Sequence, residues 1–182
     1  DMAFIMHSLS WLAPNGTAAI VCFPGIMYRG GAEQKIRKYL IDNNFVDCII
    51  QLPANLFFGT PIATCIMVLK RGKTDSRTLF IDASRECKKI TNNNKLMPNN
   101  IKRIVDEFVS RVDVDGFSKL ASYDDIVKQE YNLSVSAYVE TAFENEAVDI
   151  AELNSTISEI VASVNDLRRK VDTIVSEIEG LS

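Results

Sequence analysis

Apolar and polar positions in the first 140 residues follow two patterns. Residues 2–13 repeat apolar side chains every three or four positions, which predicts a helix that ends at the turn 14–16. Unbroken apolar runs of strand length occur near 17–23, 46–52, 62–70 and 78–82. Such runs are typical of strands that are covered on both faces of a sheet. Together these patterns predict an α/β fold.

Further helices are expected between and after these strands. The stretch 28–44 is a glycine-rich lead into a helix with Asn43 and Asn44 at its end. Residues 101–112 predict another helix, with Ile101, Ile104, Val105, Phe108 and Val109 facing inward. Ser122 followed by Asp125 predicts the capping box of a short helix. The asparagine-rich stretch 88–100 is expected to be a loop, and 131–140 to be irregular or a short strand.

The connection between the second and third strands defines a candidate binding edge. About ten residues join 46–52 to 62–70, whereas a parallel crossover takes a dozen or more, so this pair should be antiparallel. The connecting loop then lies at the carboxyl end of 46–52, where open α/β sheets bind ligands. Residues 23–31 should lie along the same edge if the strand at 17–23 is parallel to the one at 46–52.

Two adjacent phenylalanines, Phe57 and Phe58, stand in this loop, within LPANLFFGTPIATCIMVLKR (52–71). Loops at a sheet edge usually carry polar residues because their backbone meets water. Either one or both rings fold back into the core, or one ring is held at the sheet edge to stack on a flat ligand. The residue pattern leaves both interpretations open.

The last forty residues carry a heptad pattern with apolar side chains at strict three- and four-residue spacing. These positions are Ile150, Leu153, Ile157, Ile160, Val164, Leu167, Val171, Ile174, Ile178 and Leu181. The pattern predicts a helix of roughly 50 Å at 1.5 Å per residue. Its apolar edge either folds against its own domain or meets another protein, and we favour the second interpretation. The expected domains are therefore 1–140 and 141–182.

Charge is divided unevenly between these two parts. The chain of 182 residues has a net charge of −4, which argues against indiscriminate binding of nucleic acid. Residues 1–140 hold 17 Lys and Arg against 15 Asp and Glu, and residues 141–182 hold 3 against 9. Contact with a polyanion is therefore expected in the first part.

Composition excludes several other classes of protein. The apolar runs are too short to cross a bilayer, and no signal-peptide pattern is visible at the start. The four cysteines are far apart and three lie in apolar runs, which predicts reduced thiols in a cytosolic protein. The single histidine, His7, has no metal-ligand partner at a suitable spacing, and no metal site is expected.

Several stretches of the chain resemble one family, the modification (M) subunits of type I restriction–modification systems, which are adenine-N6 DNA methyltransferases. AFIMHSLSWLAPNGTAAIVCFPG and YRGGAEQKIRKYLIDNN resemble segments of the catalytic domain. LPANLFFGTPIATCIMVLKR is similar to the family pattern LPxNLFxGTxIPTCIxVLxK, with Phe58, Pro61 and Ala63 as departures. YDDIVKQEYNLSVSAYVE resembles the segment that closes this domain, and the heptad tail resembles the C-terminal helix.

The resemblance covers essentially the whole chain but omits two motifs of the family. Its glycine-rich cofactor loop and its Asn-Pro-Pro-Phe catalytic motif precede the segments matched here, and neither occurs in 1–182. The resemblance therefore implies the C-terminal half of a Rossmann-like methyltransferase sheet. It also implies that S-adenosylmethionine is bound mainly by upstream residues and that this portion is inactive alone.

The same resemblance implies roles for individual residues. A base that is methylated on its N6 amine must be flipped out of the duplex and held by stacking. The implied stacking ring is Phe57, with Phe58 as a core anchor. Other implied contacts are Asn55, Gly59 and Thr60 for the flipped adenine, Phe4 for the cofactor, and Arg29, Gly30 and Gly31 for a DNA phosphate. The alternatives are a role in shaping the loop for Asn55, Gly59 and Thr60, a core position for Phe4, and a plain tight turn for Gly30 and Gly31.

The family also implies partners for the chain. These are a specificity (S) subunit bound through the C-terminal helix, a restriction (R) subunit and double-stranded DNA, all in the cytoplasm, with a homo-oligomer through 150–181 as a further option. A second hypothesis from another class is a noncatalytic helical assembly module with a degenerate methyltransferase-like domain. A nucleotide-binding oxidoreductase has little support because no GxGxxG occurs.

Overall fold

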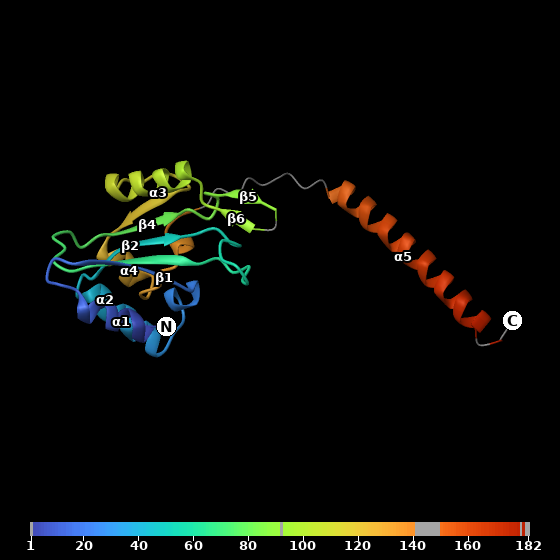
Figure 1. The fold of residues 1–182 in the computed structure, drawn as a ribbon, viewed down its shortest axis with the longest axis horizontal. Coiled ribbons are helices and arrows are strands. Elements are labelled where there is room, and N and C mark those ends of the chain that lie inside the picture. The colour runs from blue at the N-terminus through green and yellow to red at the C-terminus, as the bar shows by residue number, and fades with distance from the viewer. Residues whose placement is uncertain (1, 92, 141–149, 179, 181–182) are drawn as a thin grey trace. The chain divides into compact units, whose positions relative to one another are not determined.

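The computed structural model describes residues 2–91, 93–140, 150–178 and 180. The chain forms two compact units, Asp1–Ala142 and Phe143–Ser182. The first unit contains a five-stranded sheet with helices on both faces, and the second contains one long helix (Figure 1). The expected α/β class is confirmed for the described residues.

The central sheet has the strand order β1-β3-β2-β4-β7. Its strands are β1 (Thr17–Cys22), β2 (Val46–Gln51), β3 (Cys65–Lys70), β4 (Thr78–Asp82) and β7 (Ser118–Ala121). β3 is antiparallel to both β1 and β2, as expected for the pair 46–52 and 62–70. β1 and β2 therefore run in the same direction, and β4 pairs parallel with β2. The carboxyl ends of β1, β2 and β4 meet at one edge of the sheet, which we call the binding edge.

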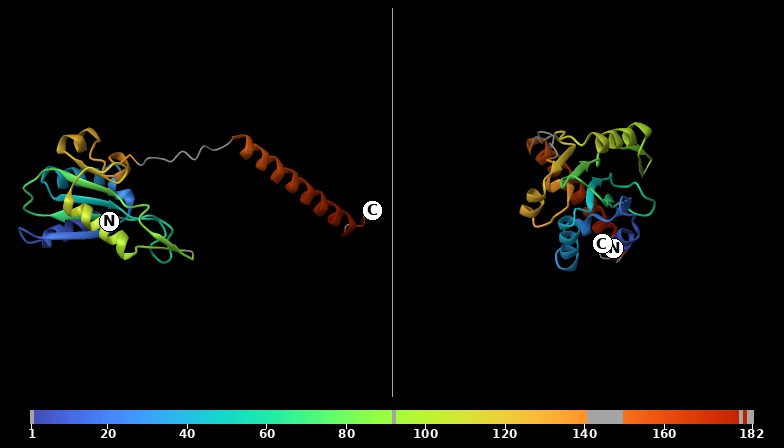
Figure 2. Two further views of the ribbon diagram at one scale, coloured as in Figure 1. Left: turned by 90° about the horizontal axis from the view of Figure 1, so that it is seen from above. Right: turned by 90° about the vertical axis from the view of Figure 1, so that its left-hand side faces the viewer.

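Helices cover the two faces of this sheet with separate apolar cores (Figures 1 and 2). On one face lie α1 (Met2–Trp11), α2 (Ala32–Asp42) and α4 (Tyr123–Lys128). Their buried residues, including Ile5, Leu40 and Ile126, pack with Ile49 and Phe80 of the sheet. On the other face α3 (Pro98–Ser110) packs its Ile104 against residues of β2 and β4.

The first strand departs from the expectation of two covered faces. β1 is an edge strand in which alternate residues are exposed, and Val21 is 54% accessible. The prediction failed because an unbroken apolar run shows only that each side chain is apolar. Whether a strand is buried depends on which helices or strands pack against its two faces. α3 covers β2 and β4 but leaves the adjoining face of β1 open in the described structure. An apolar groove of about 350 Å³ runs there, lined by residues such as Ala19, Val68 and Phe108.

The predicted inner face of the helix near 101–112 is also only partly correct. α3 buries Ile104 and partly buries Phe108, whereas Ile101, Val105 and Val109 are about half or more exposed. The apolar stripe of α3 is thus wider than the surface against which the helix packs. Together with β1, these side chains form an extended apolar face on this side of the sheet.

The stretch expected to be a loop at 88–100 contains regular structure. β5 (Lys88–Ile90) and β6 (Asn93–Lys95) form a two-stranded antiparallel hairpin, and α3 begins at Pro98. The hairpin escaped prediction because its residues are polar and exposed, so no apolar alternation marks it. β7 escaped in the same way, because its four residues, SKLA, are too few to show a period.

Smaller expectations are confirmed at the end of the unit. Ser122 and Asp125 form the capping box of α4, with the Ser122 hydroxyl accepting from the Asp125 amide at 3.2 Å. The four cysteines are free thiols, Cys48 and Cys65 fully buried. Residues 131–140 are irregular apart from a short 3-10 turn at Val135–Ala137.

The heptad tail forms the helix α5 (Ile150–Ile178), which is 29 residues long. Its described apolar side chains are about half exposed on the helix; these are Ile157, Ile160, Val161, Val164, Leu167, Val171, Ile174 and Val175. The side chains of Ile150, Leu153 and Ile178 and the whole of Leu181 lie outside what the structure describes. None of the described helices is both long and apolar enough to cross a membrane.

A buried ionic cluster ties together the edge of the sheet opposite the binding edge. Asp47 of β2 accepts from the Arg111 guanidinium at 3.1 Å and lies 3.9 Å from the Lys73 ammonium. The side chains of Asp47 and Lys73 are almost inaccessible, at 7% and 3%. The Lys73 ammonium also donates to the carbonyls of Val46 and Arg77, so its protons are satisfied. One carboxylate therefore balances two cations in a site that is largely shielded from water.

This cluster predicts a pH dependence of stability. Burial lowers the pKa of Lys73 from 10.5 to about 8, with Asp47 opposing the shift. Because the unfolded chain binds the Lys73 proton more tightly than the folded chain, stability should rise as pH increases from about 8 towards 10.5. We expect a gain of about 1 kcal/mol between pH 7 and pH 9 from this group. Urea unfolding at both pH values measures it, and in Lys73→Met this gain should disappear; an equal gain in both proteins would contradict the assignment.

Candidate functional site

The candidate site is the loop 52–64, which leaves β2 at the binding edge and returns into β3. The base of the loop is closed by main-chain and side-chain bonds. The Leu52 amide donates to the Thr64 carbonyl at 2.9 Å, and the Gln51 side-chain amide donates to the same carbonyl at 3.1 Å. Further out, the Asn55 amide donates to the Pro61 carbonyl at 3.3 Å. The two arms of the loop are therefore held together at its base and again at Asn55.

The tip of the loop is a tight turn built by Gly59. The Phe57 carbonyl accepts from the Thr60 amide at 3.5 Å, and Gly59 has φ of 82°. A positive φ at the third residue of a turn is the mark of type II, in which glycine is favoured. Phe58 then occupies the outer corner of the turn and Phe57 its entry. The Thr60 hydroxyl accepts from the Ile62 amide at 3.3 Å and so stiffens the exit.

The two aromatic rings have different surroundings. The Phe57 side chain is 43% exposed, whereas Phe58 is 97% exposed. The expectation that Phe58 anchors the loop in the core is therefore wrong, because the corner position of the turn directs it into solvent. Phe57 retains contact with the protein on part of its surface and presents the remainder to solvent.

Asn55 adopts a left-handed conformation, with φ of 55°, and is half-buried. Its carbonyl accepts from the Asn94 amide of β6 at 2.8 Å, and the Asn94 side chain donates to the Ala54 carbonyl at 2.8 Å. Asn55 thus shapes the loop and connects it to the β5–β6 hairpin. The two other predicted contact residues of the loop, Gly59 and Thr60, belong to the turn itself.

Thr64 is a site residue that the sequence analysis did not single out. Its hydroxyl is buried at the foot of the loop and has no hydrogen-bond partner among the described residues. A buried hydroxyl without a partner costs free energy, and a bound group that supplies a hydrogen bond offsets this cost. The signal that could have identified it was a threonine at the start of an otherwise apolar strand.

The other predicted contacts lie on different elements. Phe4 is on α1 and is 74% exposed, so its alternative as a core residue is wrong. Arg29, Gly30 and Gly31 are exposed between β1 and α2. Gly31 caps α2 with φ of 71° and ψ of −131°, a conformation that only glycine adopts readily. The side chain of Arg29 folds back against Gly25, and Glu33 already supplies a negative charge to the first turn of α2.

The side chains of the loop suit binding and not catalysis. Residues 52–64 contain no titratable side chain, so the loop holds no general acid or base. It offers an aromatic face, an amide, hydroxyls and main-chain groups, which together suit a flat heterocycle. Within the described residues no group of three His, Cys, Asp or Glu side chains is placed to hold a metal ion.

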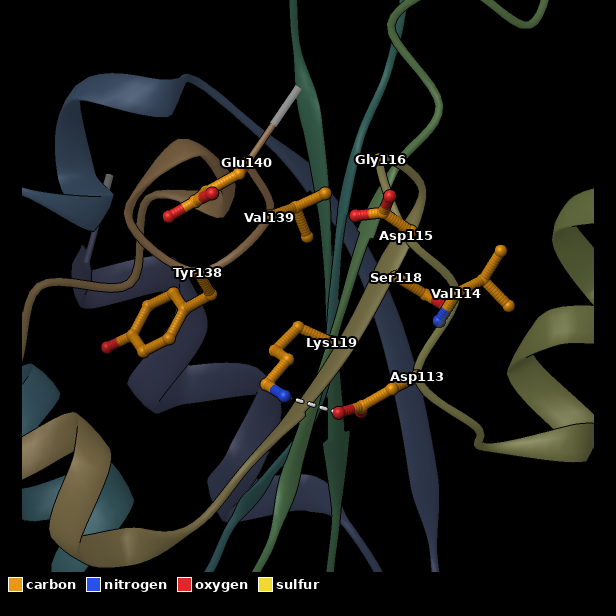
Figure 3. A pocket seen from close by; sticks show the side chains of 9 residues that line it. All are labelled: Asp113, Val114, Asp115, Gly116, Ser118, Lys119, Tyr138, Val139 and Glu140. Atoms are coloured by element: carbon orange, nitrogen blue, oxygen red, sulfur yellow. Dashed lines mark hydrogen bonds and ion pairs between the residues drawn. The ribbon is translucent and has the colours of Figure 1, made fainter. Parts of the chain in front are cut away.

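A separate hollow of about 460 Å³ lies beside β7 (Figure 3). Its charged side chains are Asp113, Asp115, Lys119 and Glu140. Lys119 forms an ion pair with Asp113, which lowers the pKa of that carboxyl. The lining therefore holds three carboxylates against one cation. An acidic hollow repels a polyanion, and none of the predicted contact residues lines it. The loop 52–64 is therefore the stronger candidate.

Comparison with known proteins identifies the family. The model of the N-6 DNA Methylase family matches residues 1–147. The chain is 49% identical over 180 residues to the MpnII methylase subunit of a type I restriction enzyme from Mycoplasma pneumoniae, covering 98% of this chain and 33% of that protein. It is 34% identical over 170 residues to the MjaVIII methylase subunit from Methanocaldococcus jannaschii, covering 90% of this chain and 29% of that protein.

Solved structures agree with this result. The chain matches the crystal structure of the methyltransferase subunit of a type I restriction–modification system from Streptococcus thermophilus with a TM-score of 0.76 and 42% identity. That match covers 77% of this chain and 30% of the other. The chain belongs to the N-6 DNA methylase family and is homologous to type I restriction-enzyme methylase subunits. It spans about a third of the length of the curated relatives it matches.

Proposed function

We propose that this chain is the C-terminal part of an adenine-N6 DNA methyltransferase subunit of a type I restriction–modification system, acting in the cytoplasm. The observation that carries the proposal is the loop 52–64, in which Phe57 stands half-exposed at the binding edge as the first residue of an uncharged turn. In this function Phe57 stacks on the flipped adenine, and Asn55, Gly59 and Thr60 shape the loop around it. Stacking of a base on an aromatic side chain contributes about 1–3 kcal/mol.

The rest of the reaction belongs to other parts of the methyltransferase. S-adenosylmethionine supplies the methyl group when it is bound. Among the described residues Phe4 offers a ring to this cofactor, but it lies on the open surface of α1, away from the buried residues of that helix. We therefore assign the cofactor site mainly to upstream residues. The uncovered apolar face of β1 and α3 supports this view, since it gives further polypeptide a surface on which to pack.

The partners proposed for the chain follow its two units. α5 meets the specificity subunit through its exposed heptad stripe, with self-association through 150–181 as the alternative. Double-stranded DNA approaches the binding edge of the first unit, with Arg29, Gly30 and Gly31 placed to meet a phosphate. The restriction subunit completes the system.

The test combines an assay and a binding measurement. The complete complex should transfer labelled methyl groups to adenine N6 in DNA, as detected by mass spectrometry of the nucleosides. The chain of 182 residues should give no transfer, and isothermal titration with S-adenosylmethionine should give no binding heat. Tight binding of the cofactor by the chain alone would contradict the assignment of the cofactor site to upstream residues.

A second candidate function is a noncatalytic assembly module. It is favoured by α5, whose exposed apolar stripe suits association. The two functions differ in the complete complex, which methylates adenine only in the first case. An upstream coding sequence with a glycine-rich loop and an Asn-Pro-Pro-Phe motif would also decide for the methyltransferase.

A further inference from the structure

The β5–β6 hairpin is bonded to the candidate site at two points. Asn94 donates its main-chain amide to the Asn55 carbonyl and its side-chain amide to the Ala54 carbonyl, both at 2.8 Å. In Figures 1 and 2 the hairpin projects from the sheet beside the connection between β2 and β3. The hairpin and the loop that carries Phe57 therefore form one surface.

The β5–β6 hairpin has few contacts of its own that would stabilise it. Each of its strands has three residues, and all of the described residues except Asn94 are exposed. A two-stranded hairpin without a buried face is at best marginally stable. Its order therefore depends on Asn94 at one side and on Glu86 near its base, which binds Arg103 and accepts from the Asn100 amide at 2.9 Å.

The two strands of the hairpin also place positive charges opposite each other. Lys88 lies directly opposite Lys95 in the antiparallel register, and like charges in this position destabilise a strand pair. Among the ion pairs of the described residues none includes Lys88, Lys89 or Lys95. Residues 84–100 contain four Lys and Arg against one carboxylate, Glu86, which is already paired.

The loop beside it has the opposite composition. Residues 52–64 carry no charge, so this loop offers no cationic side chain to a phosphate. A duplex that places one base against Phe57 brings its phosphates close to the neighbouring surface. Lys88 and Lys95, which lie opposite each other in the hairpin, supply the positive charge that the loop lacks. They do so although the chain as a whole has a net charge of −4.

We propose that the β5–β6 hairpin is a clamp for the DNA backbone, in which Lys88 and Lys95 contact phosphate and Asn94 transmits the position of the hairpin to the Phe57 loop. The inference rests on the proposed methyltransferase function. Side chains alternate between the faces of a strand, so Lys88 and Lys95 share one face and Asn94 lies on the other. The two lysines are thus free for DNA while Asn94 holds the loop.

The first experiment measures the affinity of the complete complex for a duplex with its target sequence as a function of salt. Lys88→Gln with Lys95→Gln should weaken binding about 10-fold at roughly 100 mM salt and reduce the slope of log K against log [salt] by about 1 to 2. The matched control is Lys70→Gln with Lys128→Gln, which removes the same charge from exposed lysines at the end of β3 and on α4. A slope equal to that of the control would overturn the clamp.

The second experiment tests Asn94 as a positioning residue. Asn94→Ala removes the donor to the Ala54 carbonyl without adding a charge to the hairpin, so kcat should fall several-fold while the salt slope stays unchanged. The lysine pair should show the reverse, with kcat at saturating DNA retained. The control is Asn93→Ala on the adjacent exposed residue. Wild-type kcat in Asn94→Ala would overturn the link to the loop.

These results separate the clamp from the function on which it rests. A wild-type complex that methylates adenine, together with unaffected lysine variants, would reject the hairpin and leave the methyltransferase standing. A wild-type complex that never methylates adenine would reject the proposed function itself.

Discussion

Replacing Phe57 with alanine in the complete complex should lower kcat/KM for adenine methylation by about 10- to 100-fold. Loss of about 1–3 kcal/mol of stacking on the flipped base accounts for this range. The fold should be retained, because the side chain is 43% exposed and belongs to no buried cluster of the described structure. Single-turnover methylation gives the rate, and near-UV circular dichroism checks the fold.

Phe58 provides the matched control for this experiment. It is also a phenylalanine, it is the next residue, and it is 97% exposed at the corner of the turn. Phe58→Ala should therefore change the rate much less than Phe57→Ala. If the two substitutions reduced methylation equally, stacking could not be assigned to position 57.

Replacing Asp47 with asparagine should destabilise the first unit by about 3 kcal/mol at pH 7. The substitution leaves Lys73 and Arg111 near each other without their shared carboxylate, and Lys73 is almost fully buried. The loss should shrink above pH 9, because burial places the pKa of Lys73 at about 8 and the neutral amine needs no counter-charge. Urea unfolding followed by near-UV circular dichroism at pH 7 and pH 9.5 measures both effects.

An exposed pair supplies the control for Asp47. Asp75 and Arg77 lie 2.6 Å apart with side chains 38% and 54% accessible. Asp75→Asn should cost less than about 1 kcal/mol, as exposed ion pairs generally do. An Asp47→Asn loss no larger than that of Asp75→Asn would show that the buried cluster does not stabilise the fold as argued.

The sequence predicted the elements with strong apolar periodicity and the direction of the strands around the loop. The short connection between β2 and β3 forced an antiparallel pair, and the structure has it. The extent of burial could not be predicted for β1 or α3. A strand or helix is buried only where another element packs on it, and the apolar pattern does not specify the position of that element. Hence Val21, Ile101 and Val105 were expected inside and lie exposed.

The site was predicted in outline and missed in two details. The position of the loop followed from the directions of the strands, and these directions can be predicted from the lengths of the connections between them. A core position for Phe58 is wrong because Gly59 is the third residue of a tight turn, and the residue before it stands at the outer corner of that turn. The hairpin was missed because nothing in a polar stretch indicates pairing, although its contacts through Asn94 are what join it to the loop.

The account depends on the ring of Phe57 meeting the target base. The most direct measurement is a structure of the complete complex on its DNA target with the adenine flipped out. The account predicts that the Phe57 ring lies in stacking contact with this adenine while Phe58 does not touch it. A flipped adenine enclosed by other side chains, with Phe57 packed against protein, would contradict it.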